Sequence, residues 1–127
     1  MTALSHFEIF GDEPEKLAEL YAALFGWRIE QAPGVDYWRI QNGDGAAQPI
    51  GGLARRPSFE LRGWLAYFQV PSVTDAIATV ERHGGRVLKE RTAVPRTAWY
   101  AVIADPADNA FAVWEPDPLA FPPPEPD

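Results

Sequence analysis

Two residues near the start of the chain have the side chains that acid–base chemistry requires. His6 and Glu8 are separated by one residue in SHFEIF, a segment that is typical of a β-strand. Alternate side chains of a strand point to the same side of the sheet, so both face one way. A carboxylate beside an imidazole raises the basicity of the ring, which makes the pair a candidate catalytic site. The alternative is that Glu8 forms a structural ion pair with an arginine of a neighbouring strand.

Aromatic residues on predicted strands are the second candidate feature, because their rings either stack on planar ligands or fill a core. The candidate ligand-binding residues are Trp38, Tyr67, Gln69, Trp99 and Trp114. Alternation places Trp64 and Phe68 on the opposite side from Tyr67 and Gln69, packed against helices. It does not fix which side of the sheet Trp38 and Trp99 occupy.

Composition excludes several classes of protein. The sequence contains no cysteine, so thiolate metal sites, disulfides and cysteine nucleophiles are impossible. A formal charge of -7, from 18 acidic and 11 basic side chains, opposes binding to nucleic acids and anionic lipids. No apolar run approaches the roughly 20 residues of a membrane span, and the first residues do not resemble a signal peptide. We therefore expect a cytoplasmic protein with no nucleic-acid or membrane partner.

The first half of the chain reads as strand, helix and three strands. The strands are predicted at residues 4–10, 27–31, 37–41 and 49–54. Asp12 is the expected N-cap of the helix, Pro14 suits its first turn and Gly26 ends it. The predicted apolar stripe of this helix consists of Leu17, Leu20, Tyr21, Leu24 and Phe25.

The second half repeats this order. Strands are predicted at residues 64–70, 86–89, 98–104 and 109–115, with a helix that Ser72 caps and His83-Gly84-Gly85 ends. The expected fold is α+β, a single domain over residues 1–117 with βαβββ modules at about 4–55 and 64–115. Residues 118–127 are proline-rich and predict a mobile tail, with a proline-rich recognition segment as the alternative.

Several segments together resemble the superfamily of glyoxalases, bleomycin-resistance proteins and extradiol dioxygenases, also called vicinal oxygen chelate proteins. They are HFEIFGDEPEKLAELYAALFGW, YWRI, IGGL, HGG and VPRTAWYAVIADPADNAFAVWEPD. The resemblance covers about residues 4–117 and implies two modules that form a cupped mixed sheet around a ligand cavity, with helices outside. It also implies a homodimer. Asp108 stands where the family's last turn usually has glycine, and aspartate tolerates the left-handed backbone of such a turn.

The resemblance also raises the question of a divalent metal, which the family's enzymes bind through His, Glu or Gln. His6 matches the ligand of the first strand, but Leu65 and Ala112 stand at two further ligand positions and cannot coordinate. Near Gly51 and Gly52 there is no ligand either. Glu115 should face the other side of the sheet from Ala112, and Gln69 is a weak ligand. We therefore expect no cofactor and no complete metal site.

These observations favour a small-molecule-binding protein that lacks the usual metal triad. It would either sequester its ligand or act on it through His6 and Glu8. One alternative is a metal-dependent lyase, isomerase or dioxygenase that acts on vicinal oxygens, with His6 as a ligand. Another is a resistance-type protein that sequesters an antibiotic, in which aromatic strands hold an aromatic natural product.

Overall fold

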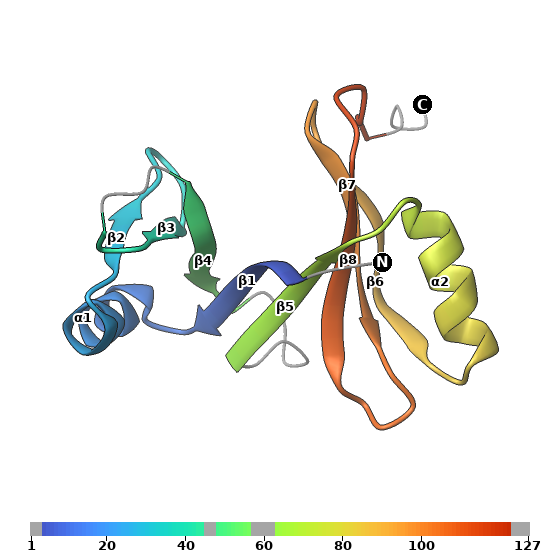
Figure 1. Cartoon of the computed structure of the whole chain (residues 1–127), viewed down its shortest axis with the longest axis horizontal. Coiled ribbons are helices and arrows are strands. Elements are labelled where there is room, and N and C mark those ends of the chain that lie inside the picture. The colour runs from blue at the N-terminus through green and yellow to red at the C-terminus, as the bar shows by residue number, and fades with distance from the viewer. Residues whose placement is uncertain (1–3, 45–47, 57–62, 123–127) are drawn as a thin grey trace. The chain divides into compact units, whose positions relative to one another are not determined.

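A computed structural model describes residues 4–44, 48–56 and 63–122 (Figure 1). The chain forms two compact units that divide between Ala66 and Tyr67, with Leu4 assigned to the second. Each unit contains one helix and one set of hydrogen-bonded strands. Among the described residues, no helix is long and apolar enough to cross a membrane.

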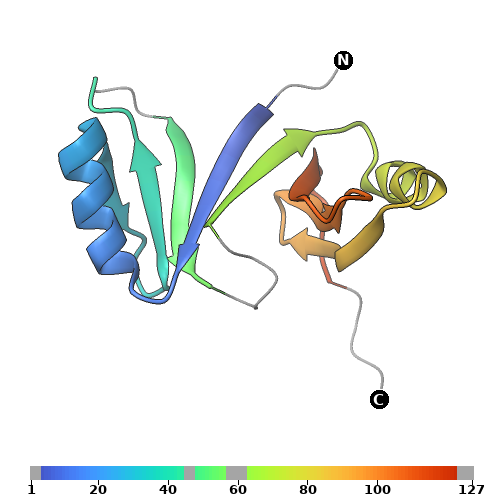
Figure 2. The ribbon, with the colours of Figure 1, turned by 90° about the horizontal axis from the view of Figure 1, so that it is seen from below.

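The first unit contains the first predicted βαβββ module. Its elements are β1 (Leu4–Gly11), α1 (Pro14–Phe25), β2 (Arg28–Gln31), β3 (Tyr37–Gln41) and β4 (Pro49–Arg55). The strands lie in the order β2-β3-β4-β1, with β1 parallel to β4 and the other pairs antiparallel. Figure 2 shows α1 along one face of these strands.

The second module repeats the topology. It consists of β5 (Gly63–Gln69), α2 (Val73–Arg82), β6 (Arg86–Val94), β7 (Ala98–Ala104) and β8 (Ala110–Pro116). Its strand order is β6-β7-β8-β5, and β5 pairs with β8 in parallel as β1 pairs with β4. The α+β class and the repeated βαβββ order are therefore confirmed.

The core of the first unit lies between α1 and one face of the sheet. Ile9, Leu53 and Trp38 are register partners across β1, β4 and β3, and all three are buried. Leu17, Ala18 and Tyr21 of α1 pack against this row. Because side chains alternate along a strand, the neighbours of this row in sequence point away from α1.

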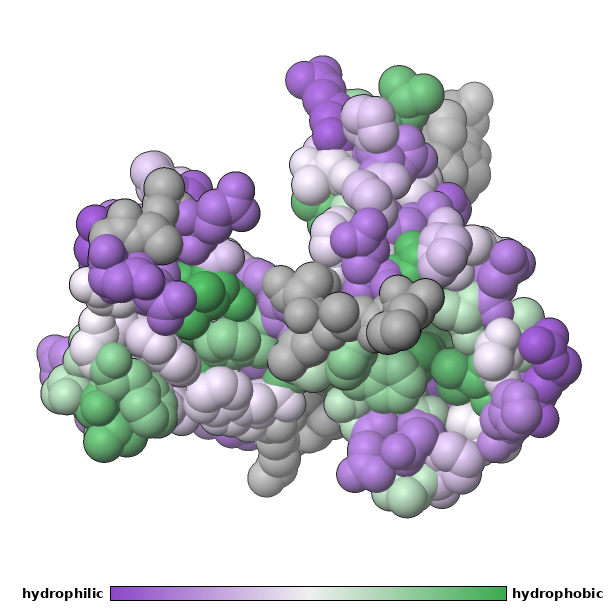
Figure 3. Space-filling model, in the orientation of Figure 1, coloured by the Kyte–Doolittle hydropathy of each residue, from purple (hydrophilic) through white to green (hydrophobic). Residues whose placement is uncertain are grey.

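Part of the predicted apolar stripe of α1 is exposed. Leu17 and Tyr21 pack on the core as expected, but Leu20, Leu24 and Phe25 are 54%, 64% and 51% exposed. The contact line of the helix runs through Leu17, Ala18 and Tyr21, so Leu20 lies to one side of it, while Leu24 and Phe25 lie in the last turn of the helix. Apolar side chains accordingly gather on the surface over α1, at the lower left of Figure 3.

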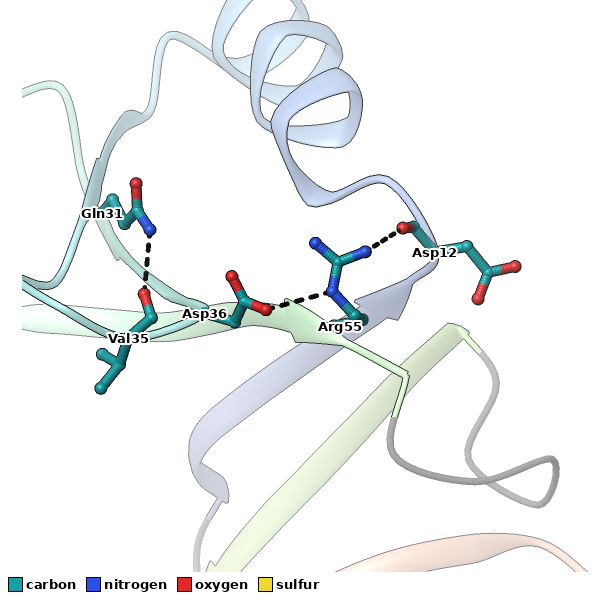
Figure 4. A network of polar contacts seen from close by, with 5 residues as sticks. All are labelled: Asp12, Gln31, Val35, Asp36 and Arg55. Carbon is teal, nitrogen blue, oxygen red and sulfur yellow. Dashed lines mark hydrogen bonds and ion pairs between the residues drawn. The ribbon is translucent and has the colours of Figure 1, made fainter.

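The predicted cap of α1 is also wrong. The N-cap is Glu13, without a side-chain hydrogen bond, and Pro14 begins the helix. The Asp12 carbonyl instead accepts a 2.6 Å hydrogen bond from Arg55, which also binds Asp36 at 3.2 Å (Figure 4). Arg55 thus connects the end of β4 to the loops before α1 and before β3.

In the second unit, α2 begins as predicted. Ser72 is the N-cap, and its hydroxyl accepts a hydrogen bond from the backbone N–H of Asp75 at 3.1 Å. The carboxylate of Glu115 accepts another from the backbone N–H of Val73 at 2.9 Å. Glu115 therefore faces α2, on the side of the sheet opposite Ala112, as the alternation of β8 predicts. Its charge also lies favourably at the positive end of the helix dipole.

The last turn and the start of the predicted tail are ordered by backbone contacts. Asp108 has a φ of 66°, so aspartate does adopt the left-handed conformation expected at this turn. The carbonyl of Ala120 accepts a hydrogen bond from the backbone N–H of Arg96, and Ala120 is fully buried. The rest of the predicted mobile tail, residues 123–127, lies outside the described residues.

Candidate functional site

His6 and Glu8 lie side by side on the face of the first unit that points away from α1. Their Nε2 and Oε2 atoms are 3.6 Å apart, and their side chains are 28% and 16% exposed. Both groups are therefore largely shielded from water. The shared orientation that alternation predicts is confirmed by this distance.

Register places two further residues beside Glu8 on this face. Glu8 pairs with Gly52 of β4, and Gly52 pairs with Arg39 of β3. Side chains of register partners project from the same side of a sheet, so Arg39 shares the face of Glu8. Tyr37 has the same parity as Arg39 and joins them. We call the set His6, Glu8, Tyr37, Arg39 and Gly52 the His6 face.

The phenol of Tyr37 crosses the sheet above Gly52 and reaches Glu8. Its hydroxyl donates a hydrogen bond to the Glu8 carboxylate. A Cβ on Gly52 would collide with the Tyr37 hydroxyl and with two ring carbons, the farther of them 2.7 Å away. Glycine at position 52 therefore leaves the space through which Tyr37 reaches Glu8. Among the residues that contact Glu8 are thus an imidazole and a phenol.

The surroundings of Tyr37 hold its hydroxyl in the neutral form. Burial raises the pKa of Tyr37 far above its usual range, and the negative charge of Glu8 and the hydrogen bond to it raise that pKa further. The positive charge of Arg39 acts in the opposite direction. At neutral pH, Tyr37 is therefore a fixed hydrogen-bond donor to Glu8.

This arrangement can move protons. A carboxylate that is held by a phenol and lies next to an imidazole has a fixed orientation and a second proton-transfer group within reach. Glu8 can accept a proton from a bound molecule, and His6 can supply or remove another. The sequence predicted the histidine and the carboxylate but gave no sign of the phenol between the strands.

The donor set does not fit the divalent metal that the family resemblance raised. Across the described parts of the chain, no group of three or more His, Asp or Glu residues is placed to hold a metal ion. Leu65 and Ala112, the residues at two of the expected ligand positions, are 2% and 0% exposed and offer no donor atom. Glu115 is engaged with the start of α2. We therefore derive no chemistry through a metal.

Three of the predicted ligand-binding residues lie together in the second unit. Gln69 is the register partner of Trp114, and Tyr67 is that of Ala112, so all four project from one face of the β5–β8 pair. Tyr100 of β7 pairs with Trp114 from the other side and adds a second ring. We call the set Tyr67, Gln69, Tyr100, Ala112 and Trp114 the Trp114 face. It points away from α2.

The other two predicted ligand-binding residues lie on helix-covered faces instead. Trp38 is 5% exposed and belongs to the core beneath α1. Trp99 packs with the core that α2 covers, where its Nε1 donates to Asp117 and Arg91 stacks on its ring at 3.6 Å. Both rings are therefore engaged in contacts within the protein.

The positions of Trp64 and Phe68 agree with their predicted packing. The ring of Trp64 stacks on Phe7 and meets the edge of Tyr21 of α1 at 5.7 Å. Phe68 makes an edge-to-face contact with Phe111, with ring centroids 6.1 Å apart. Phe111 in turn packs on the core beneath α2. Alternation was therefore sufficient to place these two residues.

Sequence reasoning missed Tyr37, Arg39 and Gly52 as site residues. The available signal was the pair Gly51-Gly52 inside an apolar strand, since glycine there often marks the close approach of another group. What approaches could not be known without the pairing of β3 with β4. Tyr37 and Arg39 lie on β3, and β4 is the strand that pairs with both β3 and β1 and so fixes their positions relative to Glu8.

Comparison with known proteins agrees with this architecture. The family of the glyoxalase-like domain matches residues 8–114. The protein named "Putative glyoxylase CFP32" from Mycobacterium tuberculosis is 29% identical over 115 residues, which cover 87% of this chain and 43% of that protein. The anthracycline biosynthesis protein DnrV of Streptomyces peucetius is 28% identical over 125 residues, covering 85% and 45%. The chain thus spans less than half the length of these curated relatives.

A solved structure shares the fold at much lower identity. A glyoxalase/bleomycin resistance protein/dioxygenase superfamily member from Vibrio splendidus has a TM-score of 0.63 and 12% identity, covering 91% of this chain and 99% of that one. The match of the domain family over most of the chain, together with the repeated βαβββ order, settles the relationship. The chain belongs to the glyoxalase-like domain family.

Proposed function

We propose that the protein binds a small molecule on the His6 face and acts on it by acid–base chemistry, without the metal triad of the family. The observation that carries this proposal is the position of Glu8, which contacts His6 at 3.6 Å and accepts a hydrogen bond from Tyr37. A carboxylate that only stabilised the sheet would not need a largely shielded imidazole on the same face.

The reaction class that suits this geometry is proton abstraction from a carbon next to a carbonyl group. Glu8 takes the proton, and the electron pair of the broken C–H bond moves to the carbonyl oxygen. Protonated His6 donates its proton to that oxygen, which gives an enol. When a proton returns to the same carbon from either side and the enol hydroxyl gives its proton back to His6, the product is the original compound or its epimer. Atoms and charge therefore balance without a further reactant.

Deuterium exchange tests this proposal. In D2O, we expect the protein to speed the exchange of protons next to the carbonyl in members of a panel of ketones, aldehydes and oxo acids, followed by proton NMR. Glu8→Gln should slow the exchange by about 10²–10⁴-fold, the usual contribution of a general base. Glu30→Gln, an exposed carboxylate on the same sheet, is the matched control and should leave the rate unchanged.

The same assay separates the metal-dependent alternative. Dialysis against EDTA should leave the exchange rate unchanged. Stoichiometric Ni, Mn, Fe or Zn in the purified protein, lost in His6→Ala together with activity, would instead favour a metal-dependent lyase, isomerase or dioxygenase. Lack of exchange with every compound, with and without added divalent ions, would count against both.

A second candidate function is sequestration of a planar aromatic ligand on the Trp114 face. The supporting observation is that Tyr67, Trp114 and Tyr100 share one face of three paired strands. One relative is named as an anthracycline biosynthesis protein. An aromatic stacking contact contributes about 0.5–1.5 kcal/mol beyond the area it buries.

Fluorescence titration with a soluble anthraquinone checks this second candidate. We expect quenching of tryptophan emission, and Trp114→Leu should weaken binding by roughly 2- to 10-fold. Trp99→Phe, on the α2 side of the same unit, is the control and should bind as the original protein does. Equal affinities for the original protein and Trp114→Leu would exclude stacking on this face.

A further inference from the structure

Arg39 is the cation of the His6 face, and its surroundings leave its guanidinium available. The side chain is exposed. Glu30, the register partner of Arg39 on β2, is ion-paired with Arg28 at 3.4 Å. Within the described part of the chain, the guanidinium of Arg39 makes no hydrogen bond or ion pair. Arg28, by contrast, pairs with Glu30 and donates a hydrogen bond to Gln41 at 2.9 Å, so its guanidinium is already engaged.

The positive charge of Arg39 acts on the phenol that holds the acid–base pair. It lowers the pKa of Tyr37, whose hydroxyl is bonded to Glu8. Arg39 and Glu8 are separated by one strand, β4, where position 52 carries no side chain. At about 4.8 Å between neighbouring strands, their backbones are about 10 Å apart. A short molecule that lies over the Tyr37 ring, which covers Gly52, can therefore span from the guanidinium to the Glu8 carboxylate.

The chemistry of the two ends defines the ligand. A guanidinium presents a planar pair of donors that matches a carboxylate with two parallel hydrogen bonds. A phosphate dianion is less suitable, because Glu8 and the overall charge of -7 repel a second negative charge more strongly. The reacting end must offer a proton to Glu8. Oxo acids with a short carbon chain satisfy both conditions.

We propose that the substrate of the His6 face is a small organic carboxylate whose carboxylate group binds Arg39 while its reacting carbon lies at Glu8. This rests on the proposed function of the His6–Glu8 pair and adds the substrate class. Arg39 binds the anion and sets the distance to the base. It takes no proton in the reaction.

Binding and chemistry are measured separately to test this. Succinate and 2-oxoglutarate are titrated into the ¹⁵N-labelled full chain, with dimethyl succinate as the uncharged analogue and inorganic phosphate as the alternative anion. We expect saturable shifts in β1, β3 and β4 with the carboxylates. Arg39→Gln should raise Kd at least 10-fold, whereas Arg82→Gln, which removes an exposed cation of α2, should change it less than 2-fold.

The outcomes distinguish this inference from the function on which it rests. Unchanged carboxylate affinity in Arg39→Gln, equal affinity for dimethyl succinate, stronger binding of phosphate, or no binding of either carboxylate would each overturn the anion site. If deuterium exchange occurs with neutral ketones and depends on Glu8 but not on Arg39, the substrate class is wrong and the acid–base function stands. If carboxylates bind through Arg39 and no compound exchanges, the anion site stands and the acid–base function fails.

Discussion

Replacing Gly52 by alanine is expected to destabilise the protein by about 1–3 kcal/mol and to separate Tyr37 from Glu8. The added methyl group would occupy the position of the Tyr37 hydroxyl and crowd its ring. Forcing one extra carbon into a packed site costs about this much, since the side chain must leave its preferred rotamer. Urea unfolding of the original protein and the variant measures the loss.

A double-mutant cycle shows whether the collision with Tyr37 causes this loss of stability. In a Tyr37→Ala background, the phenol is absent and Gly52→Ala should cost at least 1 kcal/mol less than in the original protein. Gly51→Ala is the matched control, because its Cβ would meet the backbone carbonyl of Phe7 at 2.7 Å whether or not Tyr37 is present. Additive losses in the Gly52–Tyr37 cycle would show that the phenol does not lie over Gly52.

Above pH 10, Tyr37 is expected to make stability fall with rising pH. The unfolded tyrosine ionises near pH 10.0, whereas burial and Glu8 keep the folded one protonated to a much higher pH. In that window the unfolded chain binds fewer protons than the folded protein, so alkali favours unfolding. The loss is at most about 1.4 kcal/mol per pH unit for one proton. Below pH 10 the contribution of Tyr37 is constant.

Comparison with Tyr37→Phe isolates this effect from the other titrating groups. The free energy of unfolding of that variant should decline less steeply between pH 10 and 11, and the difference in slope is the contribution of Tyr37. The ultraviolet absorbance of tyrosinate, measured as a function of pH, follows the loss of the Tyr37 proton directly. Glu8→Gln should lower the pKa of Tyr37 because it removes a negative charge, and Arg39→Gln should raise it. Parallel slopes for the original protein and Tyr37→Phe would contradict the burial of an uncharged phenol.

These two results also bear on the proposed chemistry. If Gly52→Ala displaces Tyr37 without unfolding the protein, Glu8 loses the hydrogen bond that fixes its orientation. Deuterium exchange in that variant should then fall. Loss of stability with an unchanged exchange rate would assign Tyr37 a structural role only.

Local patterns in the sequence determined most of the fold. Alternation and turn residues placed strands at 37–41 and 98–104 with the bounds that the structure has. The hydroxyl of Ser72 and the proline at position 14 marked the helix starts within two residues. Such signals suffice because a strand or helix start depends on nearby residues, whose backbone preferences act wherever the segment lies in the fold.

The sequence underestimated β6, which extends to Val94 although only residues 86–89 were predicted. The segment ERTAV has no apolar alternation, and it is a strand because its backbone pairs with β7 through two irregularities in register. Asp12 fails as a cap for a similar reason: its carboxylate pairs with Arg56, beyond the end of β4, at 3.9 Å. In both cases a distant partner outweighed the local preference.

For the candidate site, the sequence by itself determined that His6 and Glu8 face the same side, because two residues of equal parity on one strand always do. Only the tertiary structure decided what else lies there. The register of three strands places Arg39 on the face of Glu8, and the missing side chain at Gly52 leaves the space through which Tyr37 reaches Glu8. Register between distant segments is set by the packing of whole faces, here Ile9, Leu53 and Trp38 beneath α1, and no local pattern encodes it.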